Sequence, residues 1–240
     1  MRKQLNIDNL CIEITRRCNM ACAHCLRGDA QMADISHEVI DKALENVTSI
    51  GTLTFTGGEP SLNVEAMRYT LEKCEDEGVF VSTFYVVTNG KVVTSDFLSV
   101  LMDWYVFCAE NGGEGEYCGI ALSKDRFHEP IPARNELLLR SLSFFREDKF
   151  NRSNNDQWLL AEGRATQIAG VTRKVYDYLP EISVYENEVG IEDTLYVTVD
   201  GDVLAGCDWS YENQSKHKIG TVFKQSEWLE KLGLITTLSA

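Results

Sequence analysis

The sequence predicts an α/β fold whose mostly parallel sheet forms part of a TIM-like barrel. Short apolar runs alternate with segments of helical periodicity, and the apolar runs are nearly continuous, as in strands that are buried on both faces. Five or six strand–helix units can be counted, fewer than the eight that close a full barrel. After about residue 181 the pattern changes. We therefore expect a partial barrel over residues 1–180 and a C-terminal appendage over residues 181–240.

The strands and helices of the expected barrel are predicted from two patterns, the short apolar runs and the segments of helical periodicity. The expected strands are short runs rich in apolar and β-branched residues: 10–15, 53–56, 81–88, 117–122 and 158–161. Apolar residues between 39 and 47 share one face of a helix that begins after Ser36 as its N-cap. Further helices are expected from near Asn63, from Ser95 as a cap and over residues 134–146, and a weaker helical segment follows the fifth strand.

The appendage shows a different pattern. Residues 195–199 and 203–205 flank Asp200-Gly201, which predicts a hairpin with a type I′ turn. Residues 218–223 are expected to add a strand, and residues 226–232 a short helix. So short a segment buries little core of its own, so we expect an appendage and not an independent domain.

Composition excludes several classes of function. The chain has 240 residues and a formal net charge of −14, which disfavours binding to nucleic acid or to an anionic membrane. No apolar run follows the basic start, as a secretory signal requires, and no stretch approaches the length of a membrane-spanning helix. We therefore expect a cytoplasmic protein. In that reducing compartment, eight cysteines point to metal binding or catalysis before disulfides.

Three cysteines directly after the first expected strand form the strongest motif. Cys18, Cys22 and Cys25 have the spacing C-x3-C-x2-C, and thiolates are the ligands that select iron–sulfur clusters or zinc. Three thiolates leave one iron of a four-iron cluster without a protein ligand. Two alternatives stay open: the same spacing places three core cysteines on one helical face, and His24 with the three thiols forms a zinc site. Zinc sites usually pair cysteines as C-x2-C, and His24 stands between two of the ligands.

This C-x3-C-x2-C run resembles the signature of the radical S-adenosylmethionine superfamily. The resemblance implies a partial (β/α)6 barrel and an oxygen-sensitive [4Fe–4S] cluster held by the three cysteines. It also implies that the open iron is chelated by the amino and carboxylate groups of S-adenosylmethionine. An electron from the cluster then cleaves the sulfonium, giving methionine and a 5′-deoxyadenosyl radical that abstracts hydrogen from a substrate. The residue before the third cysteine, commonly aromatic in the family, packs near the adenine; here it is His24.

A second motif follows the second expected strand. Gly57, Gly58, Glu59 and Pro60 resemble the segment that binds the methionine amine in this family. In physical terms, two glycines allow a ligand close to the backbone, and the Glu59 carboxylate suits an ammonium group. The alternative is a plain turn into the next helix.

Single residues at later strand ends complete the expected cofactor site. By the same resemblance, Asn89 lies at the rim of the site, and Ser123 and Asp125 contact the ribose or carboxylate. Arg164 binds the methionine carboxylate with its guanidinium fork. The alternatives are a turn at Asn89, a polar loop around Asp125 and a surface arginine. We treat His128 as a surface residue of that loop.

The appendage resembles the beginning of the SPASM/twitch extensions, which carry auxiliary clusters in some peptide-modifying members of the family. The similar part is the hairpin followed by Cys207. No cysteine follows Cys207, so we expect no second four-cysteine cluster there and an unligated Cys207, the alternative being a redox or substrate-facing thiol. Four other cysteines are expected to be structural: Cys11, Cys74, Cys108 and Cys118.

The leading hypothesis is an enzyme that cleaves S-adenosylmethionine and abstracts hydrogen from an organic substrate, a peptide or a small molecule. The SPASM/twitch resemblance points to peptides or proteins. A glycyl-radical activase and a small-molecule or nucleotide enzyme are alternatives of the same class. A non-catalytic iron–sulfur or zinc module is the alternative of another class, although ferredoxin-type modules supply four cysteines per cluster. The electron is expected from an external flavodoxin or ferredoxin.

Overall fold

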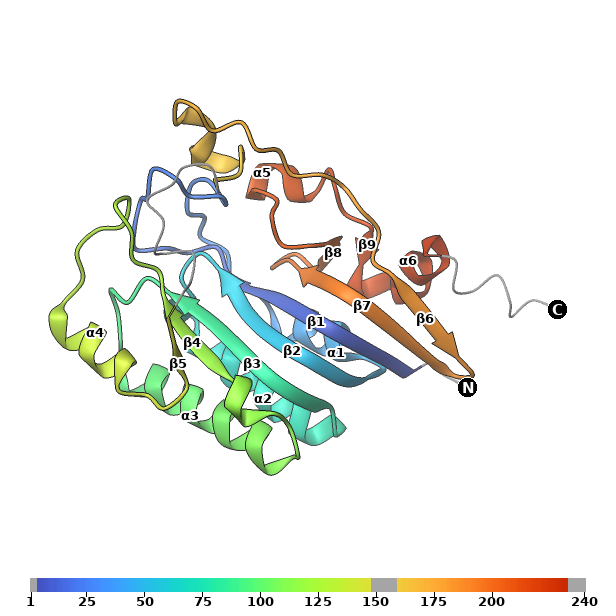
Figure 1. Cartoon of the computed structure of the whole chain (residues 1–240). Coiled ribbons are helices and arrows are strands. Elements are labelled where there is room, and N and C mark those ends of the chain that lie inside the picture. Colours follow the sequence, from blue (N-terminus) through green and yellow to red (C-terminus); the bar gives the residue numbers. More distant parts are fainter. Residues whose placement is uncertain (1–3, 148–158, 233–240) are drawn as a thin grey trace.

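The computed structural model describes residues 4–147 and 159–232, in which the chain forms a single mixed sheet with helices packed along it (Figure 1). The order of strands across the described sheet is β5-β4-β3-β2-β1-β7-β8-β9, and β6 pairs with β7 outside this path. The sheet ends at β5 and β9 and does not close into a barrel. The expected α/β class and the partial, open barrel are therefore confirmed.

The first half of the chain builds the parallel part of the sheet. Its strands are β1 (Gln4–Thr15), β2 (Val47–Gly57), β3 (Phe80–Thr88), β4 (Gly119–Leu122) and β5 (Phe145–Arg146). The connecting helices are α1 (His37–Leu44), α2 (Val64–Glu77), α3 (Ser95–Glu110) and α4 (Ala133–Arg140). All neighbouring strands in this half are parallel. Their carboxyl ends therefore meet at one edge, where ligands bind in folds of this kind.

The second half extends the sheet on the other side of β1. It contains β6 (Ile182–Tyr185), β7 (Glu188–Val197), β8 (Asp202–Ala205), α5 (Tyr211–Gln214), β9 (Gly220–Thr221) and α6 (Gln225–Lys231). β7 runs parallel to β1, while β6, β8 and β9 are antiparallel to their partners. β1 is thus an interior strand with a parallel neighbour on each side.

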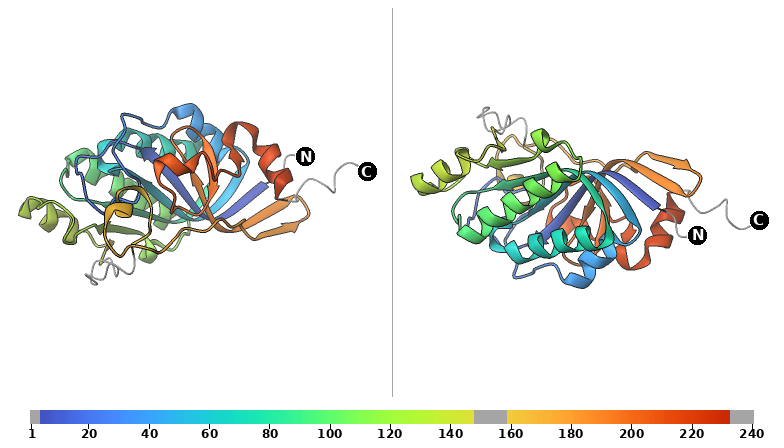
Figure 2. Two further views of the ribbon diagram at one scale, coloured as in Figure 1. Left: turned by 90° about the horizontal axis from the view of Figure 1, so that it is seen from above. Right: turned by 90° about the horizontal axis from the view of Figure 1, so that it is seen from below.

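The main core lies between the sheet and the helices α1 to α3, which cover one of its faces (Figure 2). Trp104 of α3 is fully buried and packs against Phe55 of β2 and Phe84 of β3, with ring centroids 5.3 and 6.4 Å away. The indole nitrogen donates to the carbonyl oxygen of Met67 at 3.1 Å, so this large side chain leaves no buried donor unpaired. None of the helices in the described part of the chain combines the length and the apolar character that crossing a bilayer requires.

Several expected boundaries are wrong, and the cause is local in each case. The N-cap of α3 is Thr94 and not Ser95, because the Thr94 hydroxyl accepts from the amide of Phe97 at 3.1 Å. Ser36 caps α1 as expected, but Val47 begins β2 and is not on the helix.

Two further elements were misassigned. The helix expected over 134–146 ends at Arg140, and residues 145–146 pair with β4 as β5. Of the strand expected over 158–161, Trp158 lies outside the described residues. Leu160 forms an isolated bridge to Arg173 where a strand was expected.

The hairpin around Gly201 exists, but its turn differs from the expected type I′. Val197 pairs with Val203, and the amide of Thr198 donates to the carbonyl of Asp202 at 2.9 Å, so the loop holds three residues. Gly201 has a φ of +80°, whereas Asp200 does not have positive φ, and a type I′ turn needs it at both positions. The strand expected over 218–223 is reduced to β9, and the helix expected over 226–232 is α6.

Candidate functional site

A pocket of about 370 Å³ opens at the carboxyl ends of the parallel strands. Ten residues that the sequence predicted for a cofactor site line it: Cys18, Cys22, His24, Cys25, Gly57, Gly58, Glu59, Pro60, Asn89 and Ser123. The remaining lining is largely apolar and includes Met20, Leu26, Val87, Leu159 and Leu160, with Arg27 and His128 as charged or titratable members. The residues come from the ends of four strands, so the parallel topology assembles the pocket.

The three cysteines lie on an irregular loop between β1 and α1. Residues 16–33 contain turns and bends but no helix, so the alternative of three core cysteines on one helical face is wrong. The loop is held at its base by Asp34, whose carboxylate accepts from the Thr15 hydroxyl at 2.6 Å and from the Arg17 guanidinium at 2.9 Å. All three thiols are free and partly exposed toward the pocket.

The electrostatics of Cys18 and Cys22 favour the protonated thiols. Burial raises the pKa of Cys18, and burial together with the neighbouring thiols of Cys18 and Cys25 raises the pKa of Cys22 to about 11. Three thiolates this close repel one another, and a soft cation that several thiolates share offsets that repulsion. The donor set therefore fits an iron–sulfur cluster. In the described part of the chain, the pocket is lined by these three cysteines and no fourth one.

Gly57 and Gly58 are required by the chain's own backbone. A Cβ atom at Gly57 would lie 2.0 Å from the carbonyl oxygen of Thr15, and one at Gly58 would lie 2.2 Å from that of Arg17. At these contacts the amides of Gly58 and Glu59 donate to Thr15 and Arg17 at 2.8 and 2.9 Å. The two glycines thus fasten the cysteine loop to the end of β2. This role differs from the ligand approach that their sequence suggested.

Glu59 is almost fully buried at the floor of the pocket, with 1% of its surface exposed. Its carboxylate accepts from the Thr88 hydroxyl at 2.6 Å, from the amide of Asn89 at 2.7 Å and from the amide of Ser61 at 3.1 Å. Burial raises its pKa, and these donors act in the opposite direction. Three donors leave about one acceptor position of a carboxylate open, which an ammonium group in the pocket can use.

Asn89 ties the end of β3 to the cysteine loop. Its side-chain amide donates to the Asn19 side-chain oxygen at 2.8 Å and lies 3.9 Å from the sulfur of Cys18. Ser123 lines the pocket from the end of β4, and its amide donates to the carbonyl of Thr88 at 2.8 Å. Both residues therefore line the pocket from the carboxyl ends of their strands.

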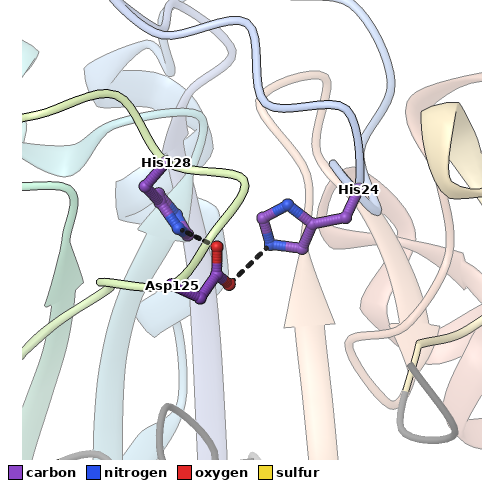
Figure 3. Close-up of side chains that lie close together, drawn as sticks. All are labelled: His24, Asp125 and His128. Carbon is purple, nitrogen blue, oxygen red and sulfur yellow. Dashed lines mark hydrogen bonds and ion pairs between the residues drawn. The ribbon is translucent and has the colours of Figure 1, made fainter. Parts of the chain in front are cut away.

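Asp125 stands between two imidazoles (Figure 3). Its carboxylate oxygens lie 3.3 Å from Nε2 of His24 and 2.8 Å from Nδ1 of His128, and the amide of Phe127 donates to it at 2.8 Å. The Phe127 ring stacks on His24 with centroids 4.7 Å apart. Asp125 itself does not line the pocket, and it acts there through the two histidines.

His128 is a pocket residue that the sequence analysis missed. Its place in a polar loop predicts a surface residue, but its side chain is only 13% exposed and lines the pocket. The available signal was its position three residues after Asp125 in a loop at a strand end. His24, Asp125 and His128 also bring three metal-ligating groups within 4.8 Å of one another.

His24 retains an unused polar atom. Burial lowers its pKa, although Asp125 acts in the opposite direction. With Nε2 facing Asp125, Nδ1 is buried and has no hydrogen-bond partner among the described residues. A buried imidazole nitrogen without a partner is costly, so the site fits a ligand with a polar group beside this ring, such as a purine.

Arg164 lies apart from the pocket lining. It borders a neighbouring pocket, its amide donates to the carbonyl of Cys25 at 2.9 Å, and its guanidinium is 3.3 Å from the carboxylate of Asp29. The charge of Arg164 nevertheless acts on the site, because it opposes the rise in the pKa of Cys22 and adds to the lowering of the pKa of His24. Its Nε is buried without a partner in the described residues.

Known proteins match the part of the chain that contains the three cysteines and the Gly57–Pro60 segment. Residues 12–107 match the family model described as the Radical SAM superfamily. A GTP 3′,8-cyclase of Clostridium acetobutylicum is 40% identical over 91 residues, which are 35% of this chain and 28% of that protein. An uncharacterized protein of Methanocaldococcus jannaschii is 27% identical over 91 residues, 36% of this chain and 32% of that protein. The match thus spans under a third of the length of either relative.

Solved structures extend the likeness in fold to most of the chain. The structure of native anSMEcpe with bound AdoMet and Kp18Cys peptide aligns with a TM-score of 0.54 at 12% identity, covering 94% of this chain and 80% of that one. The same protein with Cp18Cys peptide gives 0.51 at 14% identity with the same coverage. At such identities the likeness concerns the fold alone.

Proposed function

We propose that this chain, whose residues 12–107 match the Radical SAM superfamily model, is a radical SAM enzyme that reductively cleaves S-adenosylmethionine to abstract hydrogen from an organic substrate. One observation carries the proposal: the three thiols and the Gly57–Glu59 segment, distant in sequence, line the same pocket at the carboxyl end of the sheet. When bound, a reduced [4Fe–4S] cluster and S-adenosylmethionine supply hydrogen abstraction, with methionine and 5′-deoxyadenosine as the cofactor's products.

In the proposal, different residues of this chain bind the cluster, the methionine end and the adenine of the cofactor. Cys18, Cys22 and Cys25 hold the cluster and leave one iron for the methionine end of the cofactor. Glu59 accepts the methionine ammonium at its open acceptor position, and His24 packs on the adenine. These roles are supported by the shared pocket, by the burial of Glu59 and by the unpartnered nitrogen of His24.

The other predicted residues have supporting roles in the proposal. Gly57 and Gly58 fix the cysteine loop against β2, and Pro60 and Ser123 line the pocket. Asn89 lies at the rim, and Asp125 orients the imidazoles. Arg164 contributes positive charge from outside the pocket to the carboxylate end of the cofactor and to the cluster. The apolar lining around Met20, Leu26 and Leu160 excludes water from the reacting groups.

We propose a peptide as the substrate and an external flavodoxin or ferredoxin as the electron donor. The peptide is supported by the fold likeness to a structure that contains a bound peptide and AdoMet. The local identity to a GTP 3′,8-cyclase supports a nucleotide as the second candidate. Mass spectrometry of a peptide library and of a nucleotide panel after turnover separates the two, since only the true substrate changes mass.

The test of the reaction class requires no substrate. The full chain is reconstituted anaerobically with iron and sulfide, reduced with dithionite and incubated with S-adenosylmethionine. We expect about four irons per chain and formation of 5′-deoxyadenosine. Cys22→Ala should abolish both, while Cys74→Ala, a change in the core between the sheet and the helices, should retain both. Equal iron and equal 5′-deoxyadenosine in the two variants would overturn the proposal.

A further inference from the structure

His24, Asp125 and His128 bring metal-ligating atoms together from two separate loops (Figure 3). His24 lies on the cysteine loop, whereas Asp125 and His128 lie on the loop after β4. One ligand atom of each side chain lies within 4.8 Å of those of the other two. In the described part of the chain, no fourth histidine, cysteine or carboxylate joins this group. Both histidines line the candidate pocket.

Packing shields the three side chains from water and holds the two rings. The exposed fractions of the side chains are 18% for His24, 24% for Asp125 and 13% for His128. The Phe127 ring stacks on His24 with centroids 4.7 Å apart, and the two imidazoles meet edge to face at 5.0 Å. Rings that are already held lose little conformational freedom when they bind an ion together, which favours a site over a mobile surface cluster.

The second loop fixes the carboxylate between the rings. The amide of Phe127 donates to Oδ1 of Asp125 at 2.8 Å, and the amide of His128 donates to the Asp125 carbonyl at 3.3 Å. From this turn, Oδ2 lies 3.3 Å from Nε2 of His24 and Oδ1 lies 2.8 Å from Nδ1 of His128.

These distances are close to those between the ligands of one ion. A tetrahedral zinc ion with bonds of about 2.0–2.1 Å separates its ligand atoms by roughly 3.3 Å. The two contacts of Asp125 differ from that spacing by at most about 0.5 Å. The imidazole nitrogens of the group lie within 4.8 Å of each other, so they have to approach by no more than about 1.5 Å. Small movements of the two loops therefore suffice.

We propose that His24, Asp125 and His128 bind a divalent transition-metal ion beside the cysteine site. Two imidazole nitrogens and one carboxylate oxygen suit zinc or iron(II), whereas Mg²⁺ and Ca²⁺ prefer oxygen ligands. Three protein ligands leave one coordination position open, as in catalytic zinc sites. Because the two histidines line the pocket, a water molecule or an oxygen atom of a pocket ligand completes the coordination.

The ion determines which nitrogen of each ring carries the proton. Each imidazole presents an unprotonated nitrogen to the ion, so His24 is protonated on Nδ1 and His128 on Nε2. Metal-bound imidazoles usually donate this second N–H to an acceptor. Nδ1 of His24 is buried without a partner in the described residues, so a polar group of a pocket ligand supplies its acceptor. The ion binds in the plane of the ring, and the ring face stays available for the packing proposed above.

The proposal is tested on the full chain loaded with the iron–sulfur cluster, so that the three cysteines are occupied. Zinc is added, loosely bound zinc is removed by desalting, and zinc and iron are counted by mass spectrometry. We expect about one zinc per chain, with nitrogen and oxygen neighbours at about 2.0–2.2 Å and no sulfur at about 2.3 Å in zinc-edge X-ray absorption. A Cys18→Ala/Cys22→Ala/Cys25→Ala variant without the cluster should bind the same zinc, so the outcome does not depend on the proposed reaction.

Single variants assign the ligands. Loss of an outer-shell partner already lowers metal affinity about ten- to a hundredfold. His128→Ala and Asp125→Asn each change a ligand itself, so zinc affinity measured by chelator competition should fall at least about a hundredfold. His217→Ala is the matched control, because His217 also pairs with a carboxylate, Asp177 at 2.7 Å, but in the described residues that pair has no third ligand. Its zinc affinity should not change, and melting curves establish that each variant is folded.

Four outcomes would overturn the proposal. They are a cluster-loaded chain that holds no zinc, a sulfur neighbour in the X-ray absorption, unchanged affinity in folded His128→Ala, and an equal loss in His217→Ala. In each case His24, Asp125 and His128 form only a hydrogen-bonded group that orients the two rings.

Discussion

The amide nitrogen of Glu59 donates to the carbonyl oxygen of Arg17 over 2.9 Å, so the end of β2 is bonded directly to the loop that carries the cysteines. Gly58 lies against the same carbonyl oxygen, and a Cβ atom there would approach it to 2.2 Å. Backbone on both sides of this contact leaves no flexible group that can move aside. The geometry of the thiols therefore depends on a glycine that lies far from them in sequence.

Gly58→Ala should displace the cysteine loop. We expect a loss of about 1–3 kcal/mol in the free energy of unfolding, as in other overpacked sites, and a clear drop in iron bound after reconstitution. Gly112→Ala is the control, because Gly112 has nothing within 4 Å of its Cβ position and costs about 1 kcal/mol only through its φ of +78°. Urea unfolding and iron analysis check both. Full iron content in Gly58→Ala would contradict this role.

How far the sequence predicted the fold depends on whether the signal was local. The face of α1 and its cap Ser36 were predictable, because they rest on spacing within a few residues. The assignment of residues 145–146 failed, because Phe145 fits a helix as well as a strand until β4 is beside it. The pairing of β7 with β1 joins residues more than 180 positions apart, and no local pattern indicates it.

Glu59→Gln should separate cofactor binding from structure. The amide keeps the shape, and its oxygen accepts from Thr88 and Ser61, but its nitrogen cannot accept from the amide of Asn89. The change also removes the charge that attracts an ammonium. We expect affinity for S-adenosylmethionine to fall about ten- to a hundredfold, from a loss of roughly 1.5–3 kcal/mol, while the cluster still assembles. Calorimetry on the reconstituted protein measures this.

Glu65→Gln serves as the matched control for that change. Glu65 is an exposed glutamate at the start of α2, paired with His37 on the surface. Its substitution should leave the affinity unaltered. If Glu59→Gln binds the cofactor as tightly as this control, the carboxylate of Glu59 serves only to fix Thr88 and Asn89, and its proposed contact with the ammonium is wrong.

Asp125→Asn should disturb the adenine side of the pocket without affecting the thiols. The change weakens the contacts to His24 and His128 and leaves both rings free to turn. We expect about tenfold weaker binding of S-adenosylmethionine, as for the loss of one charge-assisted hydrogen bond. Iron content should not change. Glu129→Gln, on the same loop but paired with Lys91 at the surface, should bind normally; a similar loss there would mean that loop charge alone is responsible.

The candidate site was largely predictable because its residues directly follow strands. Ten of the predicted residues line one pocket, since parallel strands end at the same edge. Arg164 was predicted from the end of a strand over 158–161, of which the described residues show only the isolated bridge of Leu160, and it borders the neighbouring pocket. His128 was missed because only the folded loop turns its ring toward Asp125. The sequence also did not show why Gly57 and Gly58 are needed, because the reason is a close contact between two backbone segments.

Glu13 joins the two halves of the sheet through the hydrogen bonds of its carboxylate. Its carboxylate is fully buried in β1 and accepts from the Tyr196 hydroxyl at 2.6 Å, the Gln214 amide at 2.7 Å and the Arg16 guanidinium at 2.7 Å. Two of these donors belong to the second half of the chain. Removing residues 181–240 would leave this carboxylate without them and expose the edge of β1 that β7 covers.

We therefore expect a chain ending at residue 180 to lack a cooperative unfolding transition and to aggregate through the exposed edge strand. Tyr196→Phe tests the same junction in the full chain: it removes one buried hydrogen bond to a charged group and should cost about 1.5–3 kcal/mol of unfolding free energy. Tyr117→Phe, at a hydroxyl on an exposed side chain, should cost almost nothing. Calorimetry and urea unfolding measure the stability of the truncated chain and of the two variants. A truncated chain that unfolds cooperatively would mean that the parallel half folds independently and that Glu13 finds its partners only after folding.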